Sequence, residues 1–209
     1  MDITFIFFIG LVLAFIGVIP PGLLNMTAAK ISLKEGASRG IVFSIGVCVI
    51  VCVQTYIAAI FARYLSRHPD VVEILKRVAL IIFVLITVYF LLLARKQSKP
   101  QIEANVKSKH SRFFHGMLLS SLNVFPIPYQ AYMTVTLASF GWLSFKQTNI
   151  MSYVAGSAMG TFIMLYVYIF FFDKIKDKAF TSQKNMNYII GSITGLIAIV
   201  TLINILKEM

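Results

Sequence analysis

Six long stretches of the chain contain no Lys, Arg, Asp or Glu, and this feature restricts the fold more than any other. A helix needs about 20 mostly apolar residues to cross the hydrocarbon core of a bilayer, and each stretch has that length or nearly so. The stretches are 3–29, 40–62, 78–94, 113–145, 147–172 and 185–206. They occupy most of the 209 residues, of which 58% are hydrophobic and 13% charged. We therefore predict an all-α integral membrane protein with six transmembrane helices in a single transmembrane domain, 1–209.

Lys and Arg are distributed unevenly between alternate loops. The first, third and fifth loops contain 13 of them, whereas the other loops and the C-terminus contain 6. The positive-inside rule therefore predicts that the first, third and fifth loops face the cytoplasm and that both termini lie outside. The net charge of +11 would suggest nucleic-acid binding in a soluble protein, but here topology and anionic lipid headgroups explain it. We expect the lipid bilayer as a partner and no nucleic acid.

The one long polar segment, 95–112, divides the chain almost in half. Each half then contains three predicted spans, and an odd number of spans forces two homologous halves into opposite orientations. We therefore predict two inverted three-helix repeats, 1–94 and 113–209, joined by 95–112 as a cytoplasmic linker.

Proline interrupts the long apolar stretch that opens each half, at Pro20, Pro21 and Gly22 in the first and at Pro126 and Pro128 in the second. A proline inside a helix removes an N–H group and costs about 3 kcal/mol or more unless the freed backbone groups find partners. In hydrocarbon, non-helical backbone persists only where it is buried in protein or lines a cavity. We predict that the first and fourth helices are broken at these prolines, with the breaks facing inward. Such a pair of breaks at corresponding positions indicates a transport site.

Other positions of the two halves also correspond. A shift of 107 positions takes Asn25–Thr27 to Tyr132–Thr134, with Met and Thr shared, and takes Gly46 close to Gly156. The identities are few, so the matching place of the breaks is the stronger argument for a repeat.

Beyond each break a half-helix would begin, with unpaired N–H groups near Gly22–Asn25 and near Tyr129–Tyr132 that favour an anionic group such as a carboxylate. The carbonyl groups freed before each break could accept from an ammonium group, so a zwitterion is the natural ligand. The substrate-binding candidates are the residues of the breaks and the uncharged polar residues near them, together with one from the second span: Pro20, Pro21, Gly22, Asn25, Thr27, Gln54, Asn123, Pro126, Pro128, Tyr129, Gln130, Tyr132 and Thr134.

The same residues have a purely structural interpretation. Proline kinks often serve only packing, and polar residues beside them can restore the broken backbone bonds. Gln54 can either reach a cavity or make an interhelical hydrogen bond. Glu35, His115 and Asp173 are candidates for carrying protons, or they are ordinary charged and polar residues at the ends of spans.

The glycine spacing after the first break points to a family. Pro21 and Gly22 are followed by Gly36, Gly40 and Gly46, and with this spacing the first third of the chain resembles the lysine exporter (LysE/RhtB-type) superfamily of amino-acid exporters. Members carry a Pro-Gly-Pro motif in the first span followed by spaced glycines.

The second half is similar to the family at Asn123–Pro126, an approximate match to an Asn-Pro break in the fourth span. The chain departs from the pattern at Leu23, where the second proline of the motif is expected, and at Pro20, which is an extra proline. The resemblance implies a divergent member: a multi-pass amino-acid exporter of the bacterial inner membrane, with six spans in two inverted halves.

The positions of the acidic residues favour some classes of substrate over others. Every Asp and Glu lies outside a predicted span or at its edge, so we expect no metal site and no cofactor. A cationic side chain would be best met by a buried carboxylate, which favours neutral amino acids over lysine or arginine. An enzyme is not expected, because no nucleophile with a base, no pair of carboxylates at depth and no nucleotide motif is present. Export of another small solute or ion, a non-transporting membrane scaffold or assembly factor, and a homo-oligomer stay open as alternatives.

Overall fold

The computed structural model describes residues 2–20, 22–68 and 108–175 continuously, together with single residues and short runs within 70–93 and 192–206. Two compact units are formed, one by Met1–Ser66 with Glu103–Ile175 and the other by Arg67–Ile102 with Lys176–Met209. In the second unit Tyr89–Leu93 form a π-helical turn, η1, and Thr87 lies against Gly195. Much of the predicted spans 78–94 and 185–206 lies outside the described residues, and the account below concerns the first unit.

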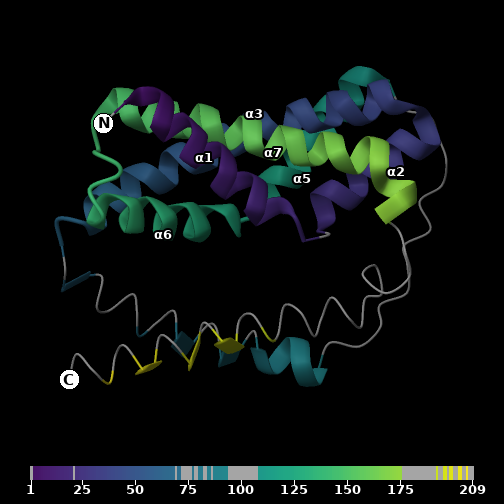
Figure 1. The fold of residues 1–209 in the computed structure, drawn as a ribbon. Coiled ribbons are helices and arrows are strands. Elements are labelled where there is room, and N and C mark those ends of the chain that lie inside the picture. Colours follow the sequence, from purple (N-terminus) through teal and green to yellow (C-terminus); the bar gives the residue numbers. More distant parts are fainter. Residues whose placement is uncertain are drawn as a thin grey trace. The chain divides into compact units, whose positions relative to one another are not determined.

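All the regular elements described in the first unit are helices, in agreement with the predicted all-α class (Figure 1). Two short helices are followed by one of 29 residues, and this order occurs twice along the chain. The helices are α1 (Ile3–Val18), α2 (Leu23–Glu35), α3 (Ala37–Leu65), α5 (Lys109–Leu122), α6 (Pro126–Ser139) and α7 (Gln147–Ile175).

Local chemistry explains where several helices begin. The Asp2 carboxylate accepts from the Thr4 N–H at 3.1 Å at the start of α1, and the Ser108 hydroxyl accepts from the Ser111 N–H at 3.2 Å at the start of α5. Helix α6 begins at Pro126, because proline is tolerated in the first turn, where its missing N–H would have no intrahelical partner. Gly36 separates α2 from α3 with a φ of 93°, a conformation that favours glycine.

The helices expose many apolar residues and bury several polar ones. On α3 a stripe of aliphatic and aromatic side chains spaced four residues apart is 40–51% exposed: Ile45, Val49, Val53, Ile57 and Phe61. The buried side chains of the first unit include Ser44, Thr55, Ser120, Thr134 and Ser157, all at 0% exposure. Continuous exposed apolar stripes indicate a lipid environment, because a soluble monomer rarely exposes such patches.

Two described helices, Ala37–Leu65 and Gln147–Phe171, are long and apolar enough to cross a membrane. The pair formed by α1 and α2 gives a third span if the two helices count as one.

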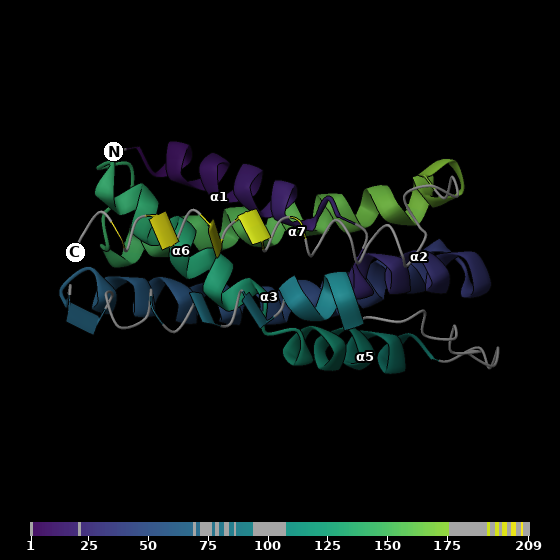
Figure 2. The ribbon, with the colours of Figure 1, turned by 90° about the horizontal axis from the view of Figure 1, so that it is seen from below.

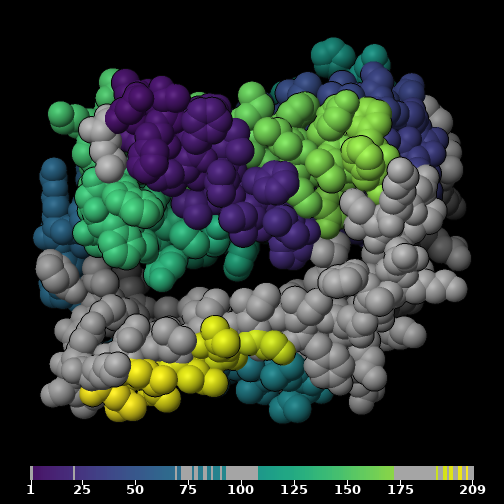
Figure 3. Space-filling model, viewed as in Figure 1, coloured from purple at the N-terminus to yellow at the C-terminus, as the bar shows by residue number. Residues whose placement is uncertain are grey.

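The first unit is built from two close helix pairs, α1 with α7 and α3 with α5 (Figure 2). A space-filling view shows the outer surface of the first pair, where α1 in purple lies beside α7 in light green (Figure 3). Glycines make both approaches possible. A Cβ atom added at Gly46 would overlap with the carbonyl oxygen of Phe113, and one at Gly156 would overlap with that of Phe7. Small residues of this kind let membrane helices pack backbone to backbone.

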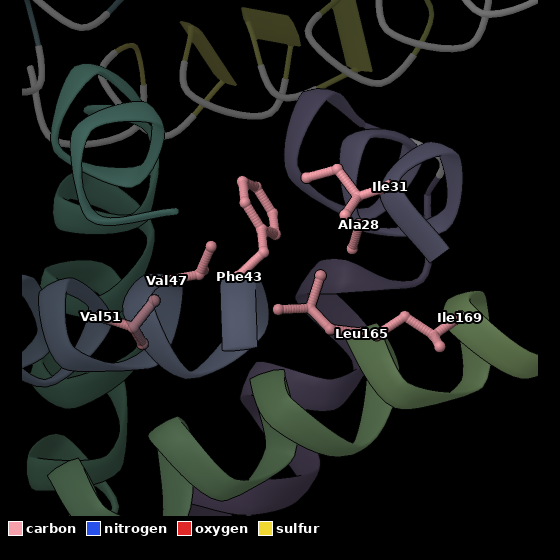
Figure 4. Close-up of a cluster of buried hydrophobic side chains, with 7 residues drawn as sticks. All are labelled: Ala28, Ile31, Phe43, Val47, Val51, Leu165 and Ile169. Atoms are coloured by element: carbon pink, nitrogen blue, oxygen red, sulfur yellow. The ribbon is translucent and has the colours of Figure 1, made fainter. Parts of the chain in front are cut away.

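A cluster of buried apolar side chains fastens α2 to α3 and α7 (Figure 4). It consists of Ala28 and Ile31 from α2, Phe43, Val47 and Val51 from α3, and Leu165 and Ile169 from α7. Helix α2 is thus held against both long helices, although α1, which precedes it, packs mainly on α7.

We predict that Gly46→Ala and Gly156→Ala each destabilise the protein by about 1–3 kcal/mol, the usual cost of overpacking a tight contact. Thermal unfolding in detergent would measure the effect, with Ile45→Ala on the exposed face of α3 as the control. Unchanged unfolding temperatures for both glycine variants would contradict the two backbone contacts.

Candidate functional site

The first connection, residues 19–22, joins α1 to α2, and the side chain of Asn25 holds it. The Asn25 amide nitrogen donates to the carbonyl oxygens of Val18 at 2.8 Å and Pro20 at 3.0 Å, and its oxygen accepts from the Gly22 N–H at 2.8 Å. Asn25 is 3% exposed. Its amide therefore restores backbone bonds that the helix ends release. Pro21 lies outside the described residues.

A tyrosine of α7 completes the end of α1. The buried Tyr168 hydroxyl donates to the carbonyl oxygen of Ile19 at 2.8 Å. The carbonyl oxygens of Val18, Ile19 and Pro20, which we expected to accept from an ammonium group, thus each accept one bond from a protein side chain. Each carbonyl oxygen has a second lone pair.

The second connection, residues 123–125, joins α5 to α6 and is held by Gln54 of α3. The Gln54 amide nitrogen donates to the carbonyl oxygens of Ser120 at 3.0 Å and Asn123 at 2.9 Å. Of the two interpretations of Gln54, the interhelical hydrogen bond is the one found. A side chain from a neighbouring helix again satisfies carbonyl groups that a helix end leaves without intrahelical partners.

The prediction of unpaired N–H groups near Tyr129–Tyr132 is wrong. Helix α6 begins at Pro126, earlier than expected, so these N–H groups lie inside the helix. The Tyr129 N–H donates to the carbonyl oxygen of Phe125 at 3.4 Å, and the Ile127 N–H donates to that of Val124 at 3.2 Å. Proline supplies no N–H, so the first turn of α6 offers few donors to an anion.

Tyr129 brings the two connections together. Its hydroxyl donates to the carbonyl oxygen of Leu13 on α1 at 2.9 Å, and a Cβ added at Gly17 would lie 3.0 Å from its ring. At the next residue, the buried Gln130 side chain accepts from the Tyr153 hydroxyl of α7 at 2.6 Å. The start of α6 therefore lies against the end of α1.

The other candidates lie at different depths. The Thr134 hydroxyl is buried and donates within its own helix to the carbonyl oxygen of Gln130 at 2.6 Å. Thr27, Asn123 and Pro126 are half-buried, whereas Pro20, Gly22, Pro128 and Tyr132 are exposed. Bonds and contacts thus link Asn25, Gln54, Asn123, Tyr129 and Gln130 to the helix ends or to neighbouring helices, and no such link involves Thr27, Pro128 or Tyr132 among the contacts described.

Three buried polar atoms have no hydrogen-bond partner within the described part of the chain: Gln54 Oε1, Thr55 Oγ1 and Ser120 Oγ. Leaving such an atom unpaired costs about 1–3 kcal/mol. Gln54 and Ser120 are adjacent, since Gln54 donates to the Ser120 carbonyl oxygen. The two side chains offer an amide oxygen, which can only accept, and a hydroxyl group, which can accept or donate.

Glu35 at the end of α2 pairs with Arg112 in the first turn of α5. Arg112 Nε donates to Glu35 Oε2 at 2.8 Å, and Nη2 forms an ion pair with Glu35 Oε1. Arg112 Nη1 lies 3.2 Å from His115 Nδ1, and an Arg39 guanidinium nitrogen donates to the Glu35 backbone carbonyl at 2.9 Å. The described residues contain no group of three or more His, Cys, Asp or Glu side chains that could hold a metal ion.

Sequence reasoning missed Ser120, Tyr153, Tyr168 and the partner of Glu35. A tyrosine in an apolar stretch is itself a signal, because a buried hydroxyl group usually finds a hydrogen-bond partner. Arg112 entered the sequence analysis only as a positive charge of the third loop.

We predict that Asn25→Ala destabilises the protein by about 1–3 kcal/mol, because buried backbone groups of the first connection lose their partners. Thr27→Ala, two residues further on the same helix, is the control and should change stability by less than about 0.5 kcal/mol. Equal unfolding temperatures for the two variants in detergent would show that Asn25 does not hold the connection.

Comparison with protein families identifies the family of this chain. Residues 15–205 match the family model described as LysE type translocator. No curated protein and no solved structure matches the chain. The family match covers well over half of the 209 residues and agrees with the apolar, lipid-facing helices. The chain belongs to the LysE type translocator family and is a membrane translocator.

Proposed function

We propose that this translocator exports small zwitterionic solutes, most specifically neutral amino acids, across the bacterial inner membrane. The two connections would form the binding region, and alternating exposure of that region to the two sides of the membrane would move the solute. Six spans in two inverted halves, 1–94 and 113–209, form the proposed framework, with the termini outside.

Reciprocal packing of the two halves supports the inverted repeat. A shift of 110 positions takes Phe43 and Gly46 of α3 to Tyr153 and Gly156 of α7. A shift of 106 takes Phe7 and Gly10 of α1 to Phe113 and Gly116 of α5.

Under these shifts four of the close glycine contacts form two corresponding pairs. Gly46 meets Phe113 as Gly156 meets Phe7, and Gly116 meets Phe43 as Gly10 meets Tyr153. The first helix of each half thus packs on the long helix of the other half. This is the arrangement expected for two related halves that pack around a pseudo-twofold axis.

The observation that carries the proposal is the meeting of the two connections. Tyr129, in the first turn of α6 just after the second connection, donates to the carbonyl oxygen of Leu13 on α1, and its ring lies against Gly17, two residues before the first connection. In translocators, interrupted helices that meet inside the bundle are the usual place for a substrate. Rocking of the two halves about this point would expose it alternately.

The chemistry of the buried groups supports a neutral zwitterion. Among the described residues, the side chains of Arg112 and Glu35 are both buried charges, and they neutralise each other. The unpaired Gln54 Oε1 and the hydroxyl groups of Thr55 and Ser120 can accept from an ammonium group. The positive end of the α2 dipole favours a carboxylate. An exporter of another small solute and a scaffold whose interrupted helices only pack are the competing functions.

Efflux from proteoliposomes preloaded with a mixture of labelled amino acids tests the proposal. We expect selective loss of one or a few neutral amino acids, and at least tenfold slower loss with Gly22→Leu, which adds a bulky side chain at the first connection. Leu23→Ala, on the adjacent exposed residue, is the matched control. Absence of amino-acid efflux under both a proton gradient and exchange conditions would reject amino-acid export.

Alanine variants of two buried serines, Ser120 and Ser157, distinguish a binding role from a structural one. Among the described residues, the Ser120 hydroxyl has no hydrogen-bond partner, whereas the Ser157 hydroxyl donates to the Gly10 carbonyl oxygen at 3.4 Å. We predict that Ser120→Ala keeps or raises stability, by up to about 1 kcal/mol, while it raises the KM for efflux several-fold. Ser157→Ala should lower stability and leave KM unchanged. An unchanged KM with Ser120→Ala would remove this hydroxyl group from the proposed site.

A further inference from the structure

We propose that the Glu35–Arg112 ion pair is a gate. It would close the substrate path on the side of the first and third loops, and its two side chains would separate in each transport cycle. The proposal rests on the alternating-access function proposed above. It assigns to these two side chains a role that positions helices and touches no substrate.

The pair is more deeply buried than charges at a loop end usually are. The side chains of Glu35 and Arg112 are 7% and 8% exposed, and two guanidinium nitrogens face the two carboxylate oxygens. Such a bidentate pair is strong and directional. Its net contribution to folding is small, because the removal of two charges from water offsets much of their attraction. A stabilising role alone therefore explains the pair poorly.

The location of the pair suits a gate. Glu35 is the last residue of α2, and Arg112 lies in the first turn of α5, so the pair joins a helix of the first half to a helix of the second. Helix α2 is otherwise fixed to α3 and α7 by the apolar cluster of Figure 4. A motion that separates the end of α2 from the start of α5 breaks this pair.

The equivalent junction at the other end of the unit has different chemistry. The shift of 106 positions that relates α1 to α5 takes Ile6 to Arg112. Ile6 is 1% exposed and packs in a buried cluster with Leu137, Leu143 and Tyr153. Near it, Phe5 contacts Trp142 edge to face, with the ring centroids 6.4 Å apart. The N-terminus of α1 and the C-terminus of α6 lie at one end of the bundle, and α2 ends at the other (Figure 1).

The two junctions therefore differ in how they respond to water. When an ion pair opens into water, both charges become hydrated, so separation costs little. When an apolar cluster opens, its side chains are exposed to water at a cost proportional to their area. We infer that the Glu35–Arg112 junction opens readily to the aqueous side next to it, while the Ile6 junction is the tighter seal.

A distance measurement tests the gate without any transport assay. Spin labels would be placed at Leu33→Cys and Lys109→Cys, on exposed residues near the ends of α2 and α5, after Cys48→Ala and Cys52→Ala. In lipid nanodiscs we expect two distance populations, with Glu35→Gln increasing the longer one at least threefold. Lys30→Gln, which removes an exposed charge from the same helix, α2, is the control and should leave the populations unchanged. An identical distribution with and without Glu35→Gln would overturn the proposal.

A reversible cross-link provides a second test, which does not depend on the folding of the Glu35→Gln variant. In the same cysteine-free background, Glu35→Cys and Arg112→Cys would be joined by a cleavable bifunctional maleimide. We expect efflux to fall at least tenfold after cross-linking and to recover after cleavage, whereas full efflux in the linked state would overturn the gate. If the natural chain shows no amino-acid efflux at all, the proposed function fails, and the distance measurement still decides on the gate.

Discussion

In a bilayer, no water is available to satisfy the backbone groups that a helix end releases, and the structure of this translocator follows from that constraint. The carbonyl groups at the end of α1 accept from Asn25 and Tyr168, and those at the end of α5 accept from Gln54. These donors come from α2, α7 and α3, so each helix end is completed by another part of the fold. Interrupted helices are therefore stable here because polar side chains from neighbouring helices satisfy their free backbone groups.

The same constraint explains what the sequence could predict. Charge-free stretches are a local property of the sequence, so the all-α class could be predicted; α1 ends at Val18 and α2 begins at Leu23, on either side of Pro20. The polar side chains near the prolines were also recognised, with both a binding and a structural interpretation. For Asn25 and Gln54 the structure provides the backbone bonds of the structural interpretation.

What could not be predicted depends on pairs of residues that are distant in sequence. Arg112 reads as one more positive loop residue until Glu35, which lies 77 positions away, is seen beside it. The start of α6 was predicted too late. Pro126 and Pro128 were interpreted as a break inside a helix, whereas proline in the first turn is typical of a helix start. Tyr153 and Tyr168 gain their roles only from the partners that packing brings to them.

The reciprocal packing of α1 on α7 and of α5 on α3 also affects how the protein is made. During synthesis α1 enters the membrane long before α7 exists, so the Ile19 carbonyl group must wait for Tyr168, 149 residues later. Until then Asn25, on the helix that follows the connection, can donate to the carbonyl groups of Val18 and Pro20 on either side of Ile19. A chain truncated before α7 would therefore leave the Ile19 carbonyl group without its Tyr168 partner.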